Sequence, residues 1–176
     1  RVETYDMYAE GDVRRDATCW DVRGVTYTER YQDTHIWLAK YRPFTENNKD
    51  AGFDNNLNYN NNYRYYRYAE TLLNAAELSV RTGSGNAATY LNEVRTRAGL
   101  DNIDATIDNI IEERHLEFVG EGKRYWDLVR TGLAASVLVP DQYGYRTNAW
   151  TASKKHIPIA QAEIDAAQGT LVQNNY

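Results

Sequence analysis

The chain has 176 residues, and its 20 Lys and Arg residues against 25 Asp and Glu residues give a net charge of −5. This acidic balance argues against nucleic acid as a partner, because phosphate binding requires a basic field. No apolar run approaches the ~20 residues of a membrane-spanning helix, so we expect the chain not to cross a bilayer. The single cysteine, Cys19, excludes an intrachain disulfide framework.

The chain starts at Arg1 without the basic, apolar and small-residue stretches of a secretory signal peptide. We therefore expect either a cytoplasmic protein or a longer chain whose own N-terminus precedes Arg1. The 15 Tyr and 4 Trp residues outnumber the 3 Phe residues. This bias, together with many Asn residues, is typical of an amphipathic surface that suits polar ligands, although half-buried tyrosines explain it equally well.

Two short antiparallel strands are predicted in the first part of the chain, since residues 19–31 and 36–41 alternate β-branched or aromatic side chains with polar ones. The Asn-rich stretch 45–62 follows and is typical of an exposed loop. Its series Asp54, Asn56 and Asn58 imitates the start of a calcium loop. The later Gly and Glu of such a loop are missing, so we do not predict a calcium site.

From residue 65 the apolar residues recur with the period of a helix. A first amphipathic helix is predicted over 65–81, with Gly83 placed to end it. A second is predicted over 87–98, with Asn86 as its N-cap. Two such helices joined by a short connection form an antiparallel hairpin of the tetratricopeptide type.

Three further helices are predicted over 106–119, 124–131 and 160–167, and a short strand over 154–159. The expected fold is therefore mainly α, with tetratricopeptide-like hairpins, irregular loops and short β-strands. We expect three segments, namely a strand and loop segment, a helical block, and a loop with a C-terminal tail, at 1–62, 63–132 and 133–176.

Arg114 lies on the apolar stripe of the third predicted helix. Three carboxylates come within its reach along that helix or in the next one: Glu117, Glu121 and Asp127. A partly buried arginine among carboxylates is most simply a structural ion pair. We therefore expect Arg114 to be at least half buried and to pair with one of these residues.

The usual signatures of catalysis are missing from the sequence. Glu112 and Glu113 are adjacent and point about 100° apart on a helix, so they cannot face each other as the carboxylates of a glycoside hydrolase do. The histidines are not spaced as zinc ligands, and no GxSxG or phosphate-binding glycine motif occurs. We therefore predict no catalytic residue, no metal and no cofactor.

Aromatic side chains in the predicted strands and loops are the candidate ligand contacts. Flat aromatic faces stack on the apolar faces of sugar rings, while amide side chains bind the hydroxyls. The candidates are Trp20, Trp37, Tyr145 and Trp150, with Asn residues of the loop 47–62. Ordinary packing of these aromatic residues remains the alternative.

The helical block resembles, in the order and spacing of four segments, the C-terminal part of the SusD/RagB family. The segments are YRYAETLLNAAEL (66–78), YLNEVRTRAGL (90–100), IIEERHLEFVGEGKRYWDLVRTG (110–132), and IPIAQAEIDA with LVQNNY (157–176). The stretch EGD-x-RRDAT at 10–18 also resembles a segment found upstream of that block. The likeness covers most of the chain and reaches Tyr176, so we expect the C-terminal portion of a larger SusD-like domain, ending at the native C-terminus.

This resemblance implies a surface-exposed lipoprotein of the outer membrane of Bacteroidetes-type bacteria, anchored by lipid through the missing N-terminal part of the same protein. Such proteins are not enzymes. They bind an oligosaccharide, or a peptide in some branches, and deliver it to a SusC-like TonB-dependent transporter. The family motif residues belong to the scaffold, so the resemblance supplies no ligand contact.

Two other classes of function stay open. One is a tetratricopeptide-type scaffold that binds a protein and no small ligand, and the other is a carboxylate-based glycosidase. Glycan binding predicts an exposed aromatic platform beside amide side chains, whereas an interaction scaffold predicts a concave helical face. Because stacked repeats need neighbours to cover their outer faces, we also expect an apolar face that stays open within this chain.

Overall fold

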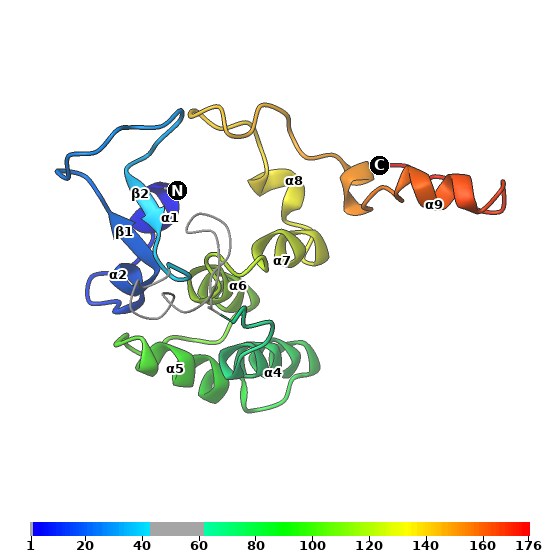
Figure 1. Cartoon of the computed structure of the whole chain (residues 1–176). Coiled ribbons are helices and arrows are strands. Elements are labelled where there is room, and N and C mark those ends of the chain that lie inside the picture. Colours follow the sequence, from blue (N-terminus) through cyan, green and yellow to red (C-terminus); the bar gives the residue numbers. More distant parts are fainter. Residues whose placement is uncertain (1, 43–61) are drawn as a thin grey trace. The chain divides into compact units, whose positions relative to one another are not determined.

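The computed structural model describes residues 2–42 and 62–176 (Figure 1). The chain divides into two compact units, Arg1–Arg124 and Tyr125–Tyr176. This division lies inside the helical block expected over 63–132. The described residues are mainly helical, with two strands of three residues each, which confirms the predicted mainly α class.

The first unit begins with the short helices α1 (Val2–Asp6) and α2 (Arg14–Thr18) and the strands β1 (Cys19–Asp21) and β2 (Ile36–Leu38). The strands pair antiparallel, as predicted. They are shorter than the predicted ranges because the chain between them forms local bonds. The His35 backbone N–H, which could extend the ladder, donates instead to the carboxylate of Asp33.

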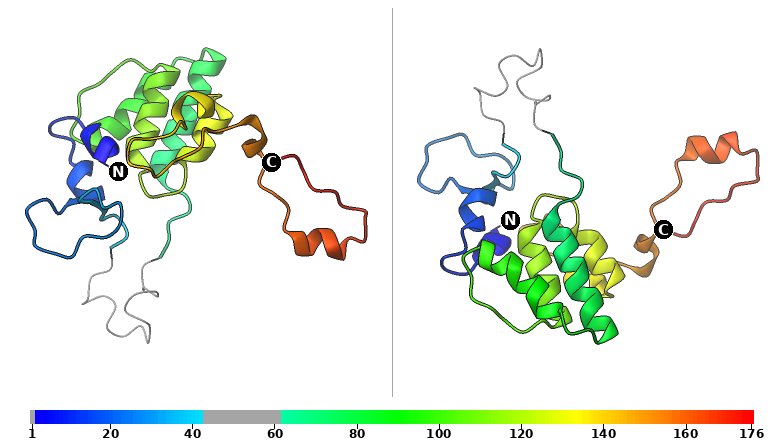
Figure 2. Two further views of the ribbon diagram at one scale, coloured as in Figure 1. Left: turned by 90° about the horizontal axis from the view of Figure 1, so that it is seen from above. Right: turned by 90° about the horizontal axis from the view of Figure 1, so that it is seen from below.

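Helices α4 (Tyr68–Thr82) and α5 (Ala87–Arg97) form the predicted antiparallel hairpin, and α6 (Ile107–Glu117) packs against both (Figure 2). As predicted, α4 ends at Gly83, whose φ of 71° turns the chain so that the Ser84 N–H bonds back to the Ser79 carbonyl. The three helices and the turn after α6 enclose an apolar core: Ala69, Leu72, Leu73, Ala76, Leu91, Val94, Ile110 and Phe118.

The start of α4 differs from the prediction, since the helix begins at Tyr68 and not at residue 65. Arg67 has an extended backbone, and its side chain binds the carboxylates of Glu117 and Glu121. These long-range ion pairs hold the chain outside the helical conformation at the point where the apolar pattern alone predicts a helix.

The N-caps of α5 and α6 also differ from each other. Asn86 has the predicted N-cap position of α5, but its side chain makes no capping hydrogen bond, because its backbone is close to helical rather than extended. Thr106 precedes α6 with an extended backbone, and its side chain accepts a hydrogen bond of 3.1 Å from the Asn109 N–H. Only the second position therefore has the expected capping chemistry.

The second unit contains α7 (Arg124–Arg130), which begins at the unit boundary, then α8 (Ala134–Val137), the 3₁₀ helix η1 (Ala152–Lys155) and α9 (Gln161–Ala166). Helices α7 and α9 confirm two predicted helices. The strand predicted over 154–159 is wrong, because η1 starts that stretch with turn-type backbone bonds. No helix within residues 2–42 and 62–176 has the length and apolarity of a membrane span.

Candidate functional site

Three aromatic side chains of the first unit, Trp20, Tyr27 and Trp37, form what we call the aromatic cluster. Trp20 and Trp37 are opposite each other in the β1–β2 pairing, and their rings meet edge to face with centroids 5.6 Å apart. The Tyr27 ring meets the Trp37 ring in the same way at 4.9 Å. Trp20 is 39% exposed, and the Arg42 guanidinium lies 4.6 Å from its ring centre. Strand pairing therefore brings two of the predicted contacts together.

Polar groups surround the aromatic cluster. The Trp37 ring N–H donates to the Asp33 carboxylate at 3.1 Å, and the Tyr27 hydroxyl lies 2.7 Å from His35 Nδ1. The backbone N–H of His35 and the Trp37 N–H lower the pKa of Asp33, so it is an anion at neutral pH. Desolvation and Asp33 raise the pKa of Tyr27 to about 12, so its hydroxyl keeps its proton. The cluster thus combines ring faces with fixed hydrogen-bonding groups.

Both ends of the segment that carries the aromatic cluster are tied to the helical core. Arg14, in α2 before β1, binds Glu113 and Glu117 of α6. Lys40, just after β2, binds the carboxylate of Glu121 at 2.5 Å and donates to the Glu117 backbone carbonyl at 2.8 Å. The strands are therefore held at two points by charge-assisted bonds, which are stronger than neutral hydrogen bonds.

The carboxylates of Glu113, Glu117 and Glu121 are the centre of this ion network, and all three are buried. Arg67 binds Glu121 through two nitrogens, at 2.9 and 2.8 Å, and Glu117 at 2.8 Å. Burial alone would raise the pKa of Glu121, but the hydrogen bonds from Arg67 and Lys40 lower it below its usual value. Two further arginines, Arg95 and Arg97, bind Glu113 and Glu117 from α5.

Arg114 is 4% exposed, which confirms the predicted burial. Its guanidinium donates to the Asn74 amide oxygen at 2.7 Å and lies 3.8 Å from a carboxylate oxygen of Glu70. It also lies over the Phe118 ring, at 5.2 Å from the ring centre. Asn74 and Glu70 belong to α4 and were not among the expected partners.

The expected carboxylate partners of Arg114 are all buried. Glu117 and Glu121 bind the cations of the ion network described above, and Asp127 pairs with Arg130 at 2.7 Å in the second unit. The other cations of the network, Arg14, Lys40 and Arg67, were not predicted because they lie far from α6 along the chain. The one sequence signal for them is the RRDAT motif that contains Arg14.

The other two predicted contacts, Tyr145 and Trp150, belong to the second unit. The Trp150 ring N–H donates to the Tyr125 hydroxyl at 3.3 Å, and the Tyr145 ring lies 5.9 Å from that of Tyr143. Both predicted residues are partly exposed. Trp126, which the sequence analysis did not select, is more exposed than either of them. The aromatic candidates therefore form two groups, one in each unit.

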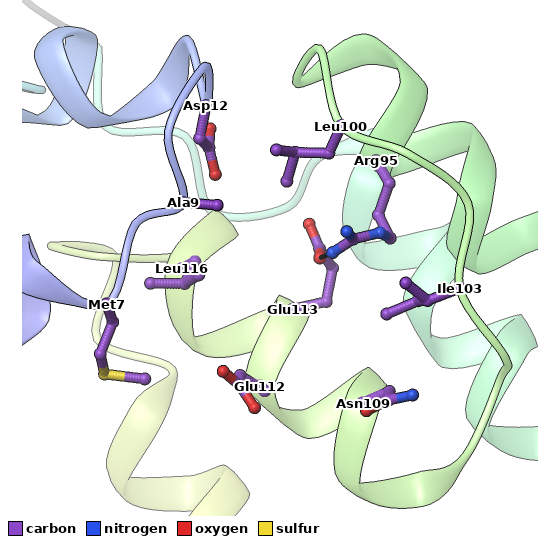
Figure 3. A pocket seen from close by; sticks show the side chains of 10 residues that line it. All are labelled: Met7, Ala9, Asp12, Arg95, Leu100, Ile103, Asn109, Glu112, Glu113 and Leu116. Carbon is purple, nitrogen blue, oxygen red and sulfur yellow. Dashed lines mark hydrogen bonds and ion pairs between the residues drawn. The ribbon is translucent and has the colours of Figure 1, made fainter.

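A hollow of about 190 Å³ lies between α6 and the segments around Met7 and Leu100 (Figure 3). Its floor contains Glu113, which is paired with both Arg14 and Arg95. Glu112 lies at the exposed edge. The hollow is smaller than the ~300–1,000 Å³ of most ligand sites, and Glu113 is a partner in ion pairs rather than a free acid. This arrangement does not resemble a pair of facing catalytic carboxylates.

The calcium-like series at Asp54 and all of the Asn-rich loop except Asn62 lie outside the described residues. Within the described ranges, no three or more His, Cys, Asp and Glu side chains are grouped so that they could hold a metal ion. The candidate site described so far is thus made of aromatic rings and hydrogen-bonding groups.

The architecture of this chain is shared with a known protein family. The model of the SusD family matches residues 13–176. The chain belongs to the SusD family. This confirms the resemblance found in the helical block and the predicted fold class, a mainly α part of a larger SusD-like domain.

Relatives in the SusD family include proteins of known structure. The chain is 62% identical to surface glycan-binding protein A from Bacteroides thetaiotaomicron, solved in complex with laminarihexaose, with a TM-score of 0.93. It is 63% identical to surface glycan-binding protein A from Bacteroides uniformis, with a TM-score of 0.90. It is also 32% identical over 162 residues to SusD-like protein P2 from Formosa agariphila.

These relatives are considerably longer than the chain. All of the chain is covered in both solved structures, but it spans only 41% and 40% of their lengths. The match with the Formosa agariphila protein covers 80% of the chain and 32% of that protein.

Proposed function

We propose that this chain is part of a non-enzymatic glycan-binding protein on the bacterial cell surface. The observation that carries the proposal is the 62% identity, over a chain covered completely, to a SusD-family protein solved with laminarihexaose. The proposed ligand is therefore a laminari-oligosaccharide, the class of sugar to which laminarihexaose belongs. Following the family resemblance, the protein is held in the outer membrane by an N-terminal lipid and passes its ligand to a SusC-like TonB-dependent transporter.

Within this chain, the proposed ligand contacts are Trp20 and Trp37 in the first unit and Tyr145 and Trp150 in the second. The exposure of Trp20 supports this role, because an exposed aromatic ring can stack on the apolar face of a sugar ring. The anion of Asp33 and the ring of Tyr27 contact Trp37, and their oxygens can accept or donate hydrogen bonds to sugar hydroxyls. The ion network supplies the rigid support that a shallow binding surface needs.

Calorimetry of the full-length protein tests the proposed function. We expect binding of laminari-oligosaccharides and no binding of other glucans or peptides at the same concentration. Changing Trp20, Trp37, Tyr145 or Trp150 to Ala should each weaken binding by about 1–3 kcal/mol if the ring is a platform. Tyr66→Ala, which removes an exposed ring from the segment just before α4, is the matched control. Unaltered affinity in all four variants would mean that this chain contributes to the scaffold and to the contact with the transporter, and not to the ligand site.

The non-enzymatic part of the proposal has its own test. The full-length protein incubated with each glycan should release no shorter product, as measured by chromatography of the reducing sugars. A turnover that disappears in Glu112→Gln or Glu113→Gln would instead make the protein a glycosidase. Affinity for a peptide in place of a glycan would move it to the peptide-binding branch of the family.

A further inference from the structure

The loop between β1 and β2 holds His35 in an unusual backbone conformation. His35 has a φ of 60° and Gln32 a φ of 59°, both in the left-handed region that residues with a Cβ atom rarely adopt. Such a conformation persists only where surrounding contacts enforce it, and it is concentrated at functional sites. The conformation of His35 is therefore set by its partners and not by its own backbone preference.

Four contacts fix the backbone and the ring of His35. Its N–H donates to the Asp33 carboxylate at 2.8 Å, and its carbonyl accepts from the N–H of the buried Val22 at 2.9 Å. The imidazole Nδ1 lies 2.7 Å from the Tyr27 hydroxyl, and Nε2 lies 3.7 Å from the Glu29 carboxylate. The backbone is thus held at both of its polar atoms, and the ring is directed at Tyr27.

Two of these partners also contact Trp37 in the aromatic cluster. The Tyr27 ring meets the Trp37 ring with centroids 4.9 Å apart, and the Asp33 carboxylate accepts from the indole N–H at 3.1 Å. Trp37 in turn meets the Trp20 ring at 5.6 Å. A displacement of His35 would move both groups that orient Trp37, so His35 acts on the cluster through Tyr27 and Asp33.

The Tyr27 hydroxyl contacts two groups but has only one proton to donate. Besides lying next to the imidazole, it is hydrogen-bonded to the Asp33 carboxylate. A hydrogen bond to an anion is stronger than one to a neutral nitrogen, so Tyr27 donates to Asp33. Its oxygen then accepts from the imidazole, which requires a proton on Nδ1 of His35.

The charge of His35 decides whether this series of bonds is complete. In a neutral ring with its proton on Nδ1, Nε2 is an acceptor that faces the acceptor oxygens of Glu29. In the imidazolium, Nε2 also carries a proton, and each contact from Glu29 to Asp33 has one donor and one acceptor. Within the described ranges, the titratable side chains placed against the His35 ring or its backbone are Tyr27, Glu29 and Asp33.

We propose that His35 is a positioning residue of the aromatic cluster, and that its protonated form holds Tyr27 and Trp37 in the arrangement that binds the sugar. The effect on binding rests on the proposed function, whereas the effect on the rings does not. Histidine side chains change charge between about pH 5 and 8. The order of the rings and the affinity for a laminari-oligosaccharide should therefore both rise as the pH falls from 8 to 6.

Near-ultraviolet circular dichroism of the full-length protein without ligand tests the positioning step. The signal of the Trp20–Trp37 pair depends on the fixed geometry of the two rings and should rise from pH 8 to pH 6. Burial and Arg124 lower the pKa of His115 to about 4, so His115 does not titrate in this window. His35→Gly should abolish the change but keep the melting temperature, because glycine adopts the left-handed φ without strain and keeps both backbone bonds.

Calorimetry of the same protein with laminarihexaose at pH 6 and pH 8 tests the effect on binding. The unchanged protein should bind about fivefold to tenfold more tightly at pH 6, which is roughly the contribution of one hydrogen bond. His35→Gly should bind about tenfold more weakly than the unchanged protein at pH 6 and should show no pH dependence.

A conservative variant and a control separate positioning from a merely structural role. Asparagine tolerates the left-handed backbone, and its Nδ2 donor takes the place of Nδ1. His35→Asn should therefore recover most of the affinity at both pH values, without the pH dependence, and it decides the question if the Gly variant does not fold. His156→Asn, which removes an exposed histidine of the second unit, should behave as the unchanged protein.

The outcomes distinguish the positioning role from the proposed function. If the circular dichroism changes with pH through His35 but no glycan binds at either pH, the proposed function fails and the positioning role stands. The positioning role is overturned if the unchanged protein gives the same spectrum at pH 6 and pH 8, or if the change persists in His35→Asn. It is equally overturned if binding is tighter at pH 8, or if His35→Gly loses affinity only as far as it loses stability.

Discussion

The helices α4, α5 and α6 and the segment 157–176 obtain their order in different ways. The three helices enclose an apolar core of their own and surround it with buried ion pairs, among them those of Arg114 and Glu117. In the segment 157–176, side-chain hydrogen bonds join Gln173 to Ile159, but none of its residues is buried. Hydrogen bonds that replace bonds to water add little net stability, so burial makes the difference. The same chain thus contains a self-supporting region with its own apolar core and a segment that is held by polar bonds.

The largest effect is expected from Arg114→Ala, which removes the buried guanidinium next to Glu70. The substitution should cost about 3–5 kcal/mol in the free energy of unfolding, because it leaves a buried carboxylate and the Asn74 amide without this partner. Denaturant melts of the full-length protein measure it. Arg23→Ala, which removes an exposed arginine paired with Asp21, is the control and should leave the melt unchanged. A loss below ~1 kcal/mol for Arg114→Ala would mean that the ion pairs of the self-supporting region are solvated.

The closed interior around α6 predicts a pH dependence. Burial, together with the positive charge of Arg124, lowers the pKa of His115 to about 4. Unfolding returns this pKa to about 6.5. Between pH ~4 and ~6.5, the unfolded chain therefore binds a proton at His115 that the folded chain does not bind. The free energy of unfolding is therefore undiminished above pH ~6.5 and falls as the pH drops towards ~4. The loss is about 2 kcal/mol between pH 7 and pH 5.

Melts of the His115→Leu variant at pH 7 and pH 5 check this dependence. The variant should lose most of the difference between the two pH values. His156→Leu, which removes an exposed histidine of the second unit, should keep this difference. If His115→Leu and the unchanged protein show the same pH profile, the interior around α6 is open to water.

The turn after α6 offers a finer comparison of the two units. Gly120 and Gly132 both have left-handed backbones, with φ of 79° and 78°. A Cβ atom at Gly120 would lie 2.8 Å from the Leu38 side chain, whereas one at Gly132 would meet no atom within 4 Å. Gly120→Ala should therefore cost about 1–3 kcal/mol. Gly132→Ala should cost less, because it adds only the backbone strain. Equal losses in denaturant melts would show that β2 does not pack against this turn.

The smallest effect is expected at the exposed end of α4. Arg81 pairs with Glu77 at 2.8 Å, one turn away on the same helix. Arg81→Ala should cost only about 0.3–0.5 kcal/mol, and this loss should disappear in high salt. Melts with and without 1 M NaCl measure the difference. A loss above ~1 kcal/mol that persists in salt would give Arg81 a role in burial that its exposure does not suggest.

The sequence by itself determined the family of the chain and the five helices α4, α5, α6, α7 and α9, whereas the short helices α1, α2 and α8 were not predicted. The recurrence of apolar residues in α4, α5 and α6 is a local property, because one helical face must be apolar in order to pack. The stop at Gly83 is also local, since it depends on the backbone freedom of one residue. The alternation of side chains also predicted the two antiparallel strands that contain Trp20 and Trp37, although it did not predict that these two residues pair. Local features of this kind can be predicted from the sequence, because they do not depend on which other segment packs against them.

Only the tertiary structure determined which charged residues pair with each other. Arg67 leaves the helix predicted for it because Glu117 and Glu121, far along the chain, bind it more favourably than the helix does. Arg114 is buried as its apolar stripe indicates, yet it meets Glu70 and Asn74 of α4, which no sequence spacing connects to it. The helical period of the apolar residues predicts which face of a helix is buried. It does not predict which of several distant carboxylates lies opposite the buried arginine, because the packing of the helices determines that.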